Sequence, residues 1–217
     1  MLAITKSIAL QGLEGYLVSI EVDISSGMPC FEIVGLPDTT VKEARERVKT
    51  AIRNSGIEFL SRKIIVNLAP AGTRKEGSTF DLPIAIGILI ATGNIVGNLG
   101  NFLEETLFIG ELSLNGKVEK VKGILPMCIE AKKQGIKRII VPRENSIEAS
   151  YVEGIEIIPV ENLEEIIYYL NGKKIIRIRS PAVQDAKKDI KYKYDFKDIR
   201  GQENAKRALE IAAAGRA

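Results

Sequence analysis

The sequence predicts an α/β protein of the α+β two-layer type. Three stretches support this prediction. Residues 3–34 are rich in the β-branched and apolar residues typical of strands, residues 63–93 combine a strand, a charged turn and a helix, and strand and helix patterns alternate after residue 107. At 217 residues, 45% of them hydrophobic, the chain is long enough for one good core plus an appendage, or for two small domains.

The first three strands are expected at residues 3–10, 15–24 and 30–36. Short Gly-bearing segments separate them, so an antiparallel meander is the simplest arrangement. Within the second strand, Val18, Ile20, Val22 and Ile24 alternate with polar residues. One face of the sheet should therefore lie on the core and the other toward solvent or a partner.

Residues 35–56 change to a helical period. Thr40 and Glu43 have the spacing of a capping box, and the helix should end near Asn54 and Gly56. Its apolar stripe comprises Val41, Ala44, Val48, Ala51 and Ile52, whereas its outer face carries Lys42, Arg45, Arg47, Lys49 and Arg53 against Glu43 and Glu46. That basic face is either solvated, with i,i+4 ion pairs, or a contact surface for phosphates or an acidic partner.

The central unit begins with a buried strand within residues 63–72, whose apolar run is closed by Pro70 and Gly72, and continues into a helix that is apolar on nearly every side. Ser78 and Asp81 form an S-x-x-D pattern, so the Ser78 hydroxyl is expected to cap this helix and the Asp81 carboxylate to face its positive end. At roughly 14 residues the helix is too short for a bilayer, which needs about 20. It should be the central core helix.

Two functional interpretations compete for the turn between strand and helix. Gly72 and Gly77 have the G-x-x-x-x-G spacing of a phosphate-binding loop, but Ser78 stands where that loop needs its lysine, which argues against a nucleotide site. Alternatively, Ser78 or Thr79 is a nucleophile exposed at a helix start. The structural alternative is that Ser78 is a cap and nothing more.

Farther along, residues 107–114 and 117–121 flank Asn115-Gly116, which predicts a two-residue hairpin. Helices at 124–134, 145–151 and 162–172 then alternate with strands at 137–142 and 155–160, as in an α/β second half. The last helix, 202–214, has Ala205, Ala208, Leu209 and Ala212 on one face, which a lone helix cannot bury. We therefore expect it to open a further domain.

Composition excludes several kinds of site. The chain has no histidine, which rules out Ser-His and Cys-His catalysis, and Cys30 and Cys128 lack a C-x-x-C pairing, which disfavours a zinc site or a disulfide framework. No metal or cofactor site is predicted within the chain. Residues 1–10 lack the apolar segment of a secretory signal, so the expected location is the cytoplasm, without membrane attachment.

Positive charge is concentrated between residues 172 and 194. Two acidic residues, Asp185 and Asp189, leave this segment at +6, while the whole chain is +3 and the remainder therefore about −3. Such a segment is either a nucleic-acid-binding stretch or a solvated linker. The candidate nucleic-acid-binding residues are its basic residues, Lys173, Lys174, Arg177, Arg179, Lys187, Lys188, Lys191 and Lys193.

Four ordered stretches, residues 34–52, 67–89, 110–125 and 198–215, resemble the N-terminal part of the ComM/YifB proteins, bacterial AAA+ ATPases described as magnesium-chelatase-like. The resemblance implies a Lon-protease-like fold with a mixed sheet, related to the second domain of a small-subunit ribosomal protein, over residues 1–175. It further implies a basic linker at 176–196 and the first helix of an AAA+ module at 197–217, whose Walker motifs would lie beyond residue 217.

The resemblance to Lon also allows a test of peptidase chemistry. The Lon motif around the nucleophile aligns with residues 75–81, which puts Thr79 at the nucleophile position, with Ser78 beside it. Leu125 falls where the catalytic lysine belongs, and Lys122 and Lys120 lie three and five residues away. Because leucine cannot accept a proton, no catalytic residue is assigned, and Thr79, Ser78 and Lys122 remain weak candidates.

For function, the resemblance implies a non-catalytic domain of a hexameric, ATP-driven DNA helicase that promotes branch migration during natural transformation. The domain would support hexamer assembly and DNA engagement. ATP and Mg²⁺ are expected for the full-length protein. The alternatives are a Lon-like Ser/Thr-Lys peptidase and the ATPase partner of a magnesium chelatase.

Overall fold

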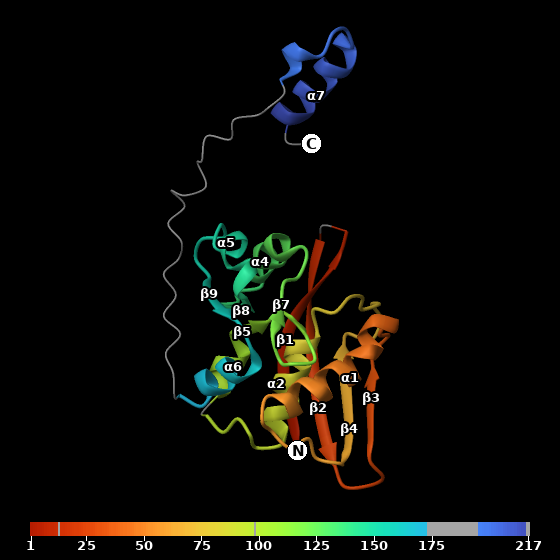
Figure 1. The fold of residues 1–217 in the computed structure, drawn as a ribbon, viewed down its shortest axis with the longest axis vertical. Helices are drawn as coiled ribbons and strands as arrows, with labels where there is room; N and C mark the ends of the chain where they lie inside the picture. Colours follow the sequence, from red (N-terminus) through yellow and green to blue (C-terminus); the bar gives the residue numbers. More distant parts are fainter. Residues whose placement is uncertain (13, 98, 173–194, 216–217) are drawn as a thin grey trace. The chain divides into compact units, whose positions relative to one another are not determined.

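A computed structural model describes residues 1–12, 14–97, 99–172 and 195–215 (Figure 1). The chain falls into two compact units, Met1–Pro181 and Ala182–Ala217. The first is α/β, as predicted, and contains three sheets. Among the described residues, no helix is both long enough and apolar enough to cross a membrane.

The largest sheet has the order β1-β2-β4-β3, formed by β1 (Leu2–Gln11), β2 (Glu14–Ser25), β4 (Lys63–Ala69) and β3 (Cys30–Val34). The expected meander is correct for β1 and β2 and wrong for β3. That strand pairs in parallel with β4, after α1 (Thr39–Asn54) has crossed over between them. The crossover lets the apolar stripe of α1 cover the sheet, which a direct hairpin from β2 to β3 would not allow.

The first core lies between this sheet and two helices, α1 and α2 (Asp81–Ala91). The predicted apolar stripe of α1 is buried throughout, and every residue of α2 except Ile90 is buried, which confirms α2 as the core helix. Gly87 permits this packing, because a Cβ there would lie 2.6 Å from a methyl group of Val22. In the second strand, the alternating residues from Val18 to Ile24 face this core, as predicted.

Two helix caps differ from expectation. Asp38, not Thr40, caps α1, its carboxylate accepting a hydrogen bond from the Val41 amide at 2.7 Å. The residue before α2 is Phe80, whose side chain forms no cap, so Ser78 is not the cap of this helix. In both cases the sequence contains a capping motif, but the helix begins at a different residue from the one that the motif predicts. Tertiary contacts of the preceding segment fix where each helix begins.

The second half of the unit builds a parallel sheet, β5-β8-β9, from β5 (Thr106–Phe108), β8 (Arg138–Pro142) and β9 (Glu156–Val160). Its other elements are α3 (Gly100–Glu104), α4 (Ile124–Lys133), a 3₁₀ turn η1 (Arg143–Asn145), α5 (Ser146–Ala149) and α6 (Leu163–Leu170). A second core packs α4 and α5 against this sheet. The predicted alternation of strands and helices is therefore confirmed.

The predicted hairpin is present but longer than two residues. β6 (Glu111–Leu112) and β7 (Val118–Glu119) pair antiparallel across residues 113–117, with Gly116 at φ 84°. Residues 107–114 do not form one strand, because Thr106–Phe108 joins the parallel sheet and only Glu111 and Leu112 pair with β7.

The second unit contains a 3₁₀ turn η3 (Phe196–Asp198) and α7 (Glu203–Gly215), close to the helix expected at 202–214. Leu209 and Ile211 are each 57% exposed. The apolar stripe of α7 is thus uncovered within the described residues, as expected of a helix that cannot bury its own face.

Candidate functional site

The turn between β4 and α2 holds the sequence candidates for a nucleophile, and hydrogen bonds attach it to residues 110–112. The Gly110 amide donates to the Thr79 carbonyl at 3.2 Å, and the Leu82 amide donates to the Gly110 carbonyl at 3.0 Å. Gly110 also leaves room for neighbouring side chains, since a Cβ there would lie 2.7 Å from Val118 Cγ1 and 3.2 Å from Leu82 Cδ2. The turn is therefore a fixed part of the core's edge.

The hydroxyls of Ser78 and Thr79 differ in their surroundings. Ser78 Oγ donates a hydrogen bond to Glu111 Oε2 of β6. The Thr79 hydroxyl makes no hydrogen bond with any described residue, and both side chains are half-buried. Across the described ranges, neither hydroxyl is hydrogen-bonded to a lysine ammonium, so the nucleophile–lysine contact of a Ser-Lys peptidase is not formed at either oxygen.

Lys122, the weak candidate for a base, lies exposed between β7 and α4. The described residues supply no hydrogen bond between it and Ser78 or Thr79. Leu125, at the position of the missing lysine, is partly buried against the second core. The candidate triplet from the sequence is therefore not assembled into a hydrogen-bonded unit.

A lysine that the sequence did not single out lies inside the turn. Lys75 is fully buried, and its ammonium donates to the Pro70 carbonyl. Its backbone pairs with the segment before α1, through the Asp38 amide to the Lys75 carbonyl at 3.0 Å and the Lys75 amide to the Leu36 carbonyl at 3.1 Å. Burial lowers the pKa of Lys75 below its ordinary value of 10.5.

Beside the turn, Arg47 of α1 and Asp81 of α2 form a two-pronged ion pair. Arg47 Nε lies 2.7 Å from Asp81 Oδ2 and Nη2 lies 3.0 Å from Oδ1. The Asp81 side chain is 1% exposed and also accepts the Leu112 amide at 3.2 Å. Burial raises the pKa of Asp81 although Arg47 and that amide oppose the rise. Arg47, expected on the outer face of α1, is thus turned inward to hold the two helices together.

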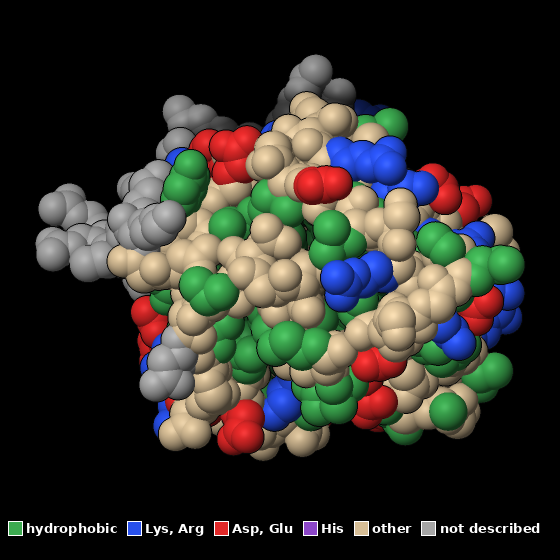
Figure 2. Space-filling view, turned by 90° about the horizontal axis from the view of Figure 1, so that it is seen from below, with side chains coloured by type: hydrophobic (Ala, Val, Ile, Leu, Met, Phe, Trp, Pro, Cys, Tyr) green, Lys and Arg blue, Asp and Glu red, His purple; other side chains and the backbone are tan. Residues whose placement is uncertain are grey.

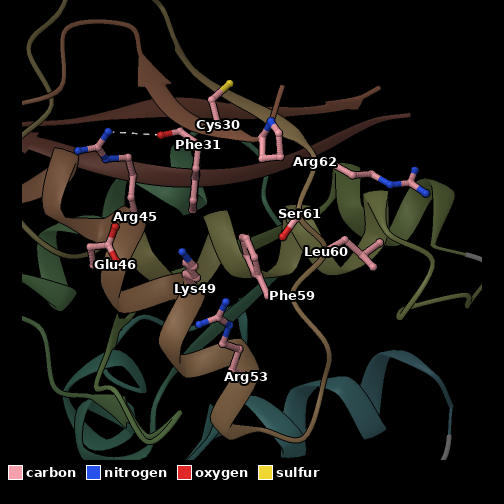
Figure 3. A pocket seen from close by; sticks show the side chains of 11 residues that line it. Cys30, Phe31, Arg45, Glu46, Lys49, Arg53, Phe59, Leu60, Ser61 and Arg62 are labelled. Atoms are coloured by element: carbon pink, nitrogen blue, oxygen red, sulfur yellow. Dashed lines mark hydrogen bonds between the residues drawn. The ribbon is translucent and has the colours of Figure 1, made fainter. Parts of the chain in front are cut away.

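Three other basic residues of α1, but not Lys42, line a pocket of about 340 Å³, here called the α1 pocket (Figure 3). Arg45, Glu46, Lys49 and Arg53 of α1 form one side, and residues 29–31 of the β3 edge and 59–62 before β4 complete it. In Figure 3 the ends of Lys49 and Arg53 lie beside the Phe59 ring, while Arg62 extends from the rim. The sequence indicated the basic face but not the pocket, which needs segments distant in sequence.

One face of the molecule is mixed in charge. The face seen in Figure 2 shows Lys and Arg side chains interspersed with Asp and Glu rather than gathered by sign. A second pocket, near Lys117 and Arg143, is lined by paired charges: Lys117 contacts Glu119 at 2.9 Å and Arg143 contacts Glu161 at 2.8 Å. Such a site has its charges already compensated.

The eight basic residues predicted to bind nucleic acid, Lys173, Lys174, Arg177, Arg179, Lys187, Lys188, Lys191 and Lys193, lie outside the described residues. Their role therefore stays a prediction. The two cysteines are free: Cys30 is half-buried in the α1 pocket and Cys128 is buried in α4, where burial raises its pKa to about 12.

Residues 20–145 match the family described as subunit ChlI of Mg-chelatase. The chain is 40% identical to competence protein ComM of Haemophilus influenzae over 216 residues, which are 99% of this chain and 42% of that protein. It is 41% identical to the uncharacterized protein YifB of Escherichia coli over 216 residues, or 99% of this chain and 41% of YifB.

A weaker similarity connects the chain to peptidases. It is 29% identical to Lon protease 2 of Bacillus subtilis over 170 residues, which are 70% of this chain and 30% of that protein.

The chain spans about two fifths of the length of ComM and YifB.

Proposed function

The chain belongs to the ChlI family, named for a subunit of Mg-chelatase, as a ComM/YifB-type member, and from this we propose that it is a non-catalytic domain of an AAA+ motor that acts on DNA. In the full-length protein, residues 1–175 would support hexamer assembly and DNA engagement. The motor would drive branch migration of DNA during natural transformation, in the cytoplasm. This family is AAA+ ATPase-like.

The non-catalytic role is supported above all by how Ser78 is held. Its hydroxyl donates to the Glu111 carboxylate, an arrangement that orients the oxygen without a basic nitrogen beside it. The buried Lys75 ammonium donates instead to the Pro70 carbonyl. Both polar groups thereby fasten the turn, which is a structural use of the residues that a Ser-Lys peptidase would need as nucleophile and base.

The DNA role is supported by charge and by similarity. Eight basic residues lie between residues 173 and 193, and one relative, similar over 99% of this chain, is named a competence protein. Backbone phosphates attract such a segment without regard to base sequence. DNA is thus the proposed partner, together with further copies of the same protein.

ATP and Mg²⁺ are proposed as cofactors of the full-length motor and not of the residues described here. The Gly72–Gly77 turn does not fit a phosphate-binding loop. Ser78 follows Gly77 where a lysine is needed, and its hydroxyl is engaged by the Glu111 carboxylate, whose negative charge would repel a phosphate. No step of ATP hydrolysis is therefore assigned to this chain.

The test uses the full-length protein and a branched DNA substrate. Replacing Lys173, Lys174, Lys187 and Lys188 by Gln should weaken salt-sensitive DNA binding and slow ATP-driven branch migration. Replacing Ser78 and Thr79 by Ala should leave both unchanged. If the variant with all four lysines replaced kept full DNA binding and full branch-migration activity, the role proposed for the basic segment would be wrong.

A Lon-like peptidase is the second candidate, favoured by one observation: a buried lysine with a lowered pKa lies three residues before Ser78. It predicts hydrolysis of an unfolded protein substrate by the chain, lost on Lys75→Met and on Ser78→Ala or Thr79→Ala. A third candidate, the ATPase partner of a magnesium chelatase, follows from the family description. It predicts ATP-dependent metal insertion into a tetrapyrrole by the full-length protein with its partner subunits.

A further inference from the structure

The α1 pocket carries an excess of positive charge. Arg45, Lys49, Arg53 and Arg62 line it, and none of the four forms an ion pair with a residue that the structure describes. By contrast, Arg47 on the same helix is paired with Asp81, and Lys117, Lys137 and Arg143 elsewhere are paired with glutamates. Glu46 is the acid in the pocket lining, so the lining holds four cationic side chains and one anionic side chain. The pocket is therefore suited to an anion that carries more than one charge.

The spacing of these cations is regular. Arg45, Lys49 and Arg53 follow one another at intervals of four residues in α1. Residues four apart lie on one helix face, about 6 Å apart along the axis. The helix thus presents a row of positive charges along the pocket rather than a single cluster, which matches an extended polyanion better than one small anion.

Two aromatic rings line the pocket. Phe31 of β3 and Phe59 stack with ring centroids 6.1 Å apart and an interplanar angle of 26°, and both rings are half-buried. Lys49 and Arg53 lie beside Phe59 in the close view (Figure 3). A concave site that combines a row of cations with aromatic rings is the combination by which single-stranded nucleic acids are bound.

We propose that the α1 pocket binds a single strand of nucleic acid, with Lys49 and Arg53 contacting its phosphates and Phe59 in contact with a base or sugar. This inference rests on the proposed DNA role and adds a site within the described unit, separate in sequence from the basic residues 173–193. Arg45 has a supporting part, because its guanidinium donates to the carbonyls of Lys42 at 3.0 Å and Phe31 at 3.4 Å.

The affinity test compares two double variants of the 217-residue chain that lose equal charge. The pocket variant, Lys49→Gln with Arg53→Gln, replaces two charged side chains of the pocket lining by neutral ones. The control variant, Lys122→Gln with Lys132→Gln, replaces two exposed lysines outside the pocket. Binding of fluorescent oligodeoxythymidine should weaken at least tenfold in the pocket variant and little in the control. Two lost phosphate contacts should also lower the slope of log affinity against log salt by about 1.4.

Cys30 supplies a second readout that needs no substitution, because it lines the same pocket. The chain has two cysteines, and the buried Cys128, with a pKa of about 12, stays unreactive while the chain is folded. Oligodeoxythymidine should therefore slow thiol alkylation of the native chain, and mass spectrometry should assign the protected site to Cys30. Thermal melting of each variant checks that it is folded.

Slowed Cys30 alkylation together with selective weakening in the pocket variant would establish the site. Equal affinity in the two double variants, or unprotected Cys30 while DNA is bound, would overturn it and leave the basic segment as the DNA contact. Protection by polyglutamate but not by DNA would overturn it in favour of an acidic protein partner. If the wild-type chain bound no DNA at low salt, the proposed DNA engagement of this chain would itself fail.

Discussion

Arg47 Nε lies 2.7 Å from Asp81 Oδ2, and this contact joins the two helices that cover the main sheet. Asp81 is 1% exposed and Arg47 21% exposed, so the carboxylate is the member of the pair that most depends on its partner. A buried charge without compensation is strongly destabilising, whereas the intact pair contributes little beyond its alternatives. Loss of Arg47 should therefore destabilise the fold strongly, although the intact pair itself adds little to the free energy of unfolding.

Arg47→Met should lower the free energy of unfolding by about 3–5 kcal/mol at neutral pH, because Asp81 is left buried and unpaired. Burial raises the pKa of Asp81 above its ordinary 3.8, and removing Arg47 raises it further. A carboxyl with a raised folded pKa stabilises below that pKa and loses this contribution as pH rises. The deficit of Arg47→Met should therefore shrink on acidification, measured by urea unfolding at several pH values. A deficit independent of pH would contradict this assignment.

Lys75 should give the folded chain an alkaline pH dependence. Because burial lowers its pKa, the unfolded chain binds more protons than the folded chain between the lowered value and 10.5. Stability rises with pH in that window. Relative to Lys75→Met, the wild-type chain should gain free energy of unfolding as pH approaches 10.5. Parallel pH curves for the two proteins would show that Lys75 is protonated alike in both states.

Ser78 and Thr79 provide a matched pair. Ser78→Ala removes a hydrogen bond to the Glu111 carboxylate and should cost about 1.5–3 kcal/mol, the range for bonds to charged groups. Thr79→Ala removes a hydroxyl without a partner among the described residues and should change stability by less than about 0.5 kcal/mol. Chemical denaturation of both variants measures this difference. Equal losses would mean that the bond to Glu111 contributes nothing.

Gly35 and Gly77 both have positive φ values, +96° and +86°, but their surroundings differ. A Cβ at Gly35 would lie 2.3 Å from the Leu68 carbonyl oxygen, whereas Gly77 has open space. Gly77→Ala should cost about 1–2 kcal/mol for the left-handed backbone. Gly35→Ala should cost about 1–3 kcal/mol more, because backbone atoms of β4 cannot move aside. Denaturant unfolding midpoints of the two variants, compared at an unchanged slope, measure the two losses of stability. A larger loss for Gly77→Ala than for Gly35→Ala would contradict this prediction.

Much of the fold follows from local pattern. The alternation in Val18 to Ile24, the apolar stripe of α1 and the all-round apolarity of α2 each predicted the surface that is buried. The prediction from local pattern was wrong where two strands could pair with the same edge of a third strand. β3 was expected beside β2, but β4 occupies that edge, and the long-range pairing of β3 with β4 has no local trace.

The candidate site was predictable in composition and not in arrangement. Basic residues on α1 could be counted, but a helical period alone does not tell that Arg47 turns inward to Asp81, while Lys49 and Arg53 form no ion pair within the described part of the chain. Likewise Lys75 belongs to a charged turn that a sequence places on the surface. Its burial depends on the strand-like contact with residues 36–38.

By itself the sequence determined most of the helices and strands, which of their faces are apolar, and which family the chain resembles, because periodicity and motif order are local properties. It did not indicate α3, and it joined β5 and β6 into one strand. Tertiary structure alone decided what the polar side chains do. A hydroxyl, an ammonium or a guanidinium takes its role from the partner within about 3 Å, as hydrogen-bond geometry requires. Here those partners come from residues such as Glu111, Pro70 and Asp81, brought into place by packing of the core.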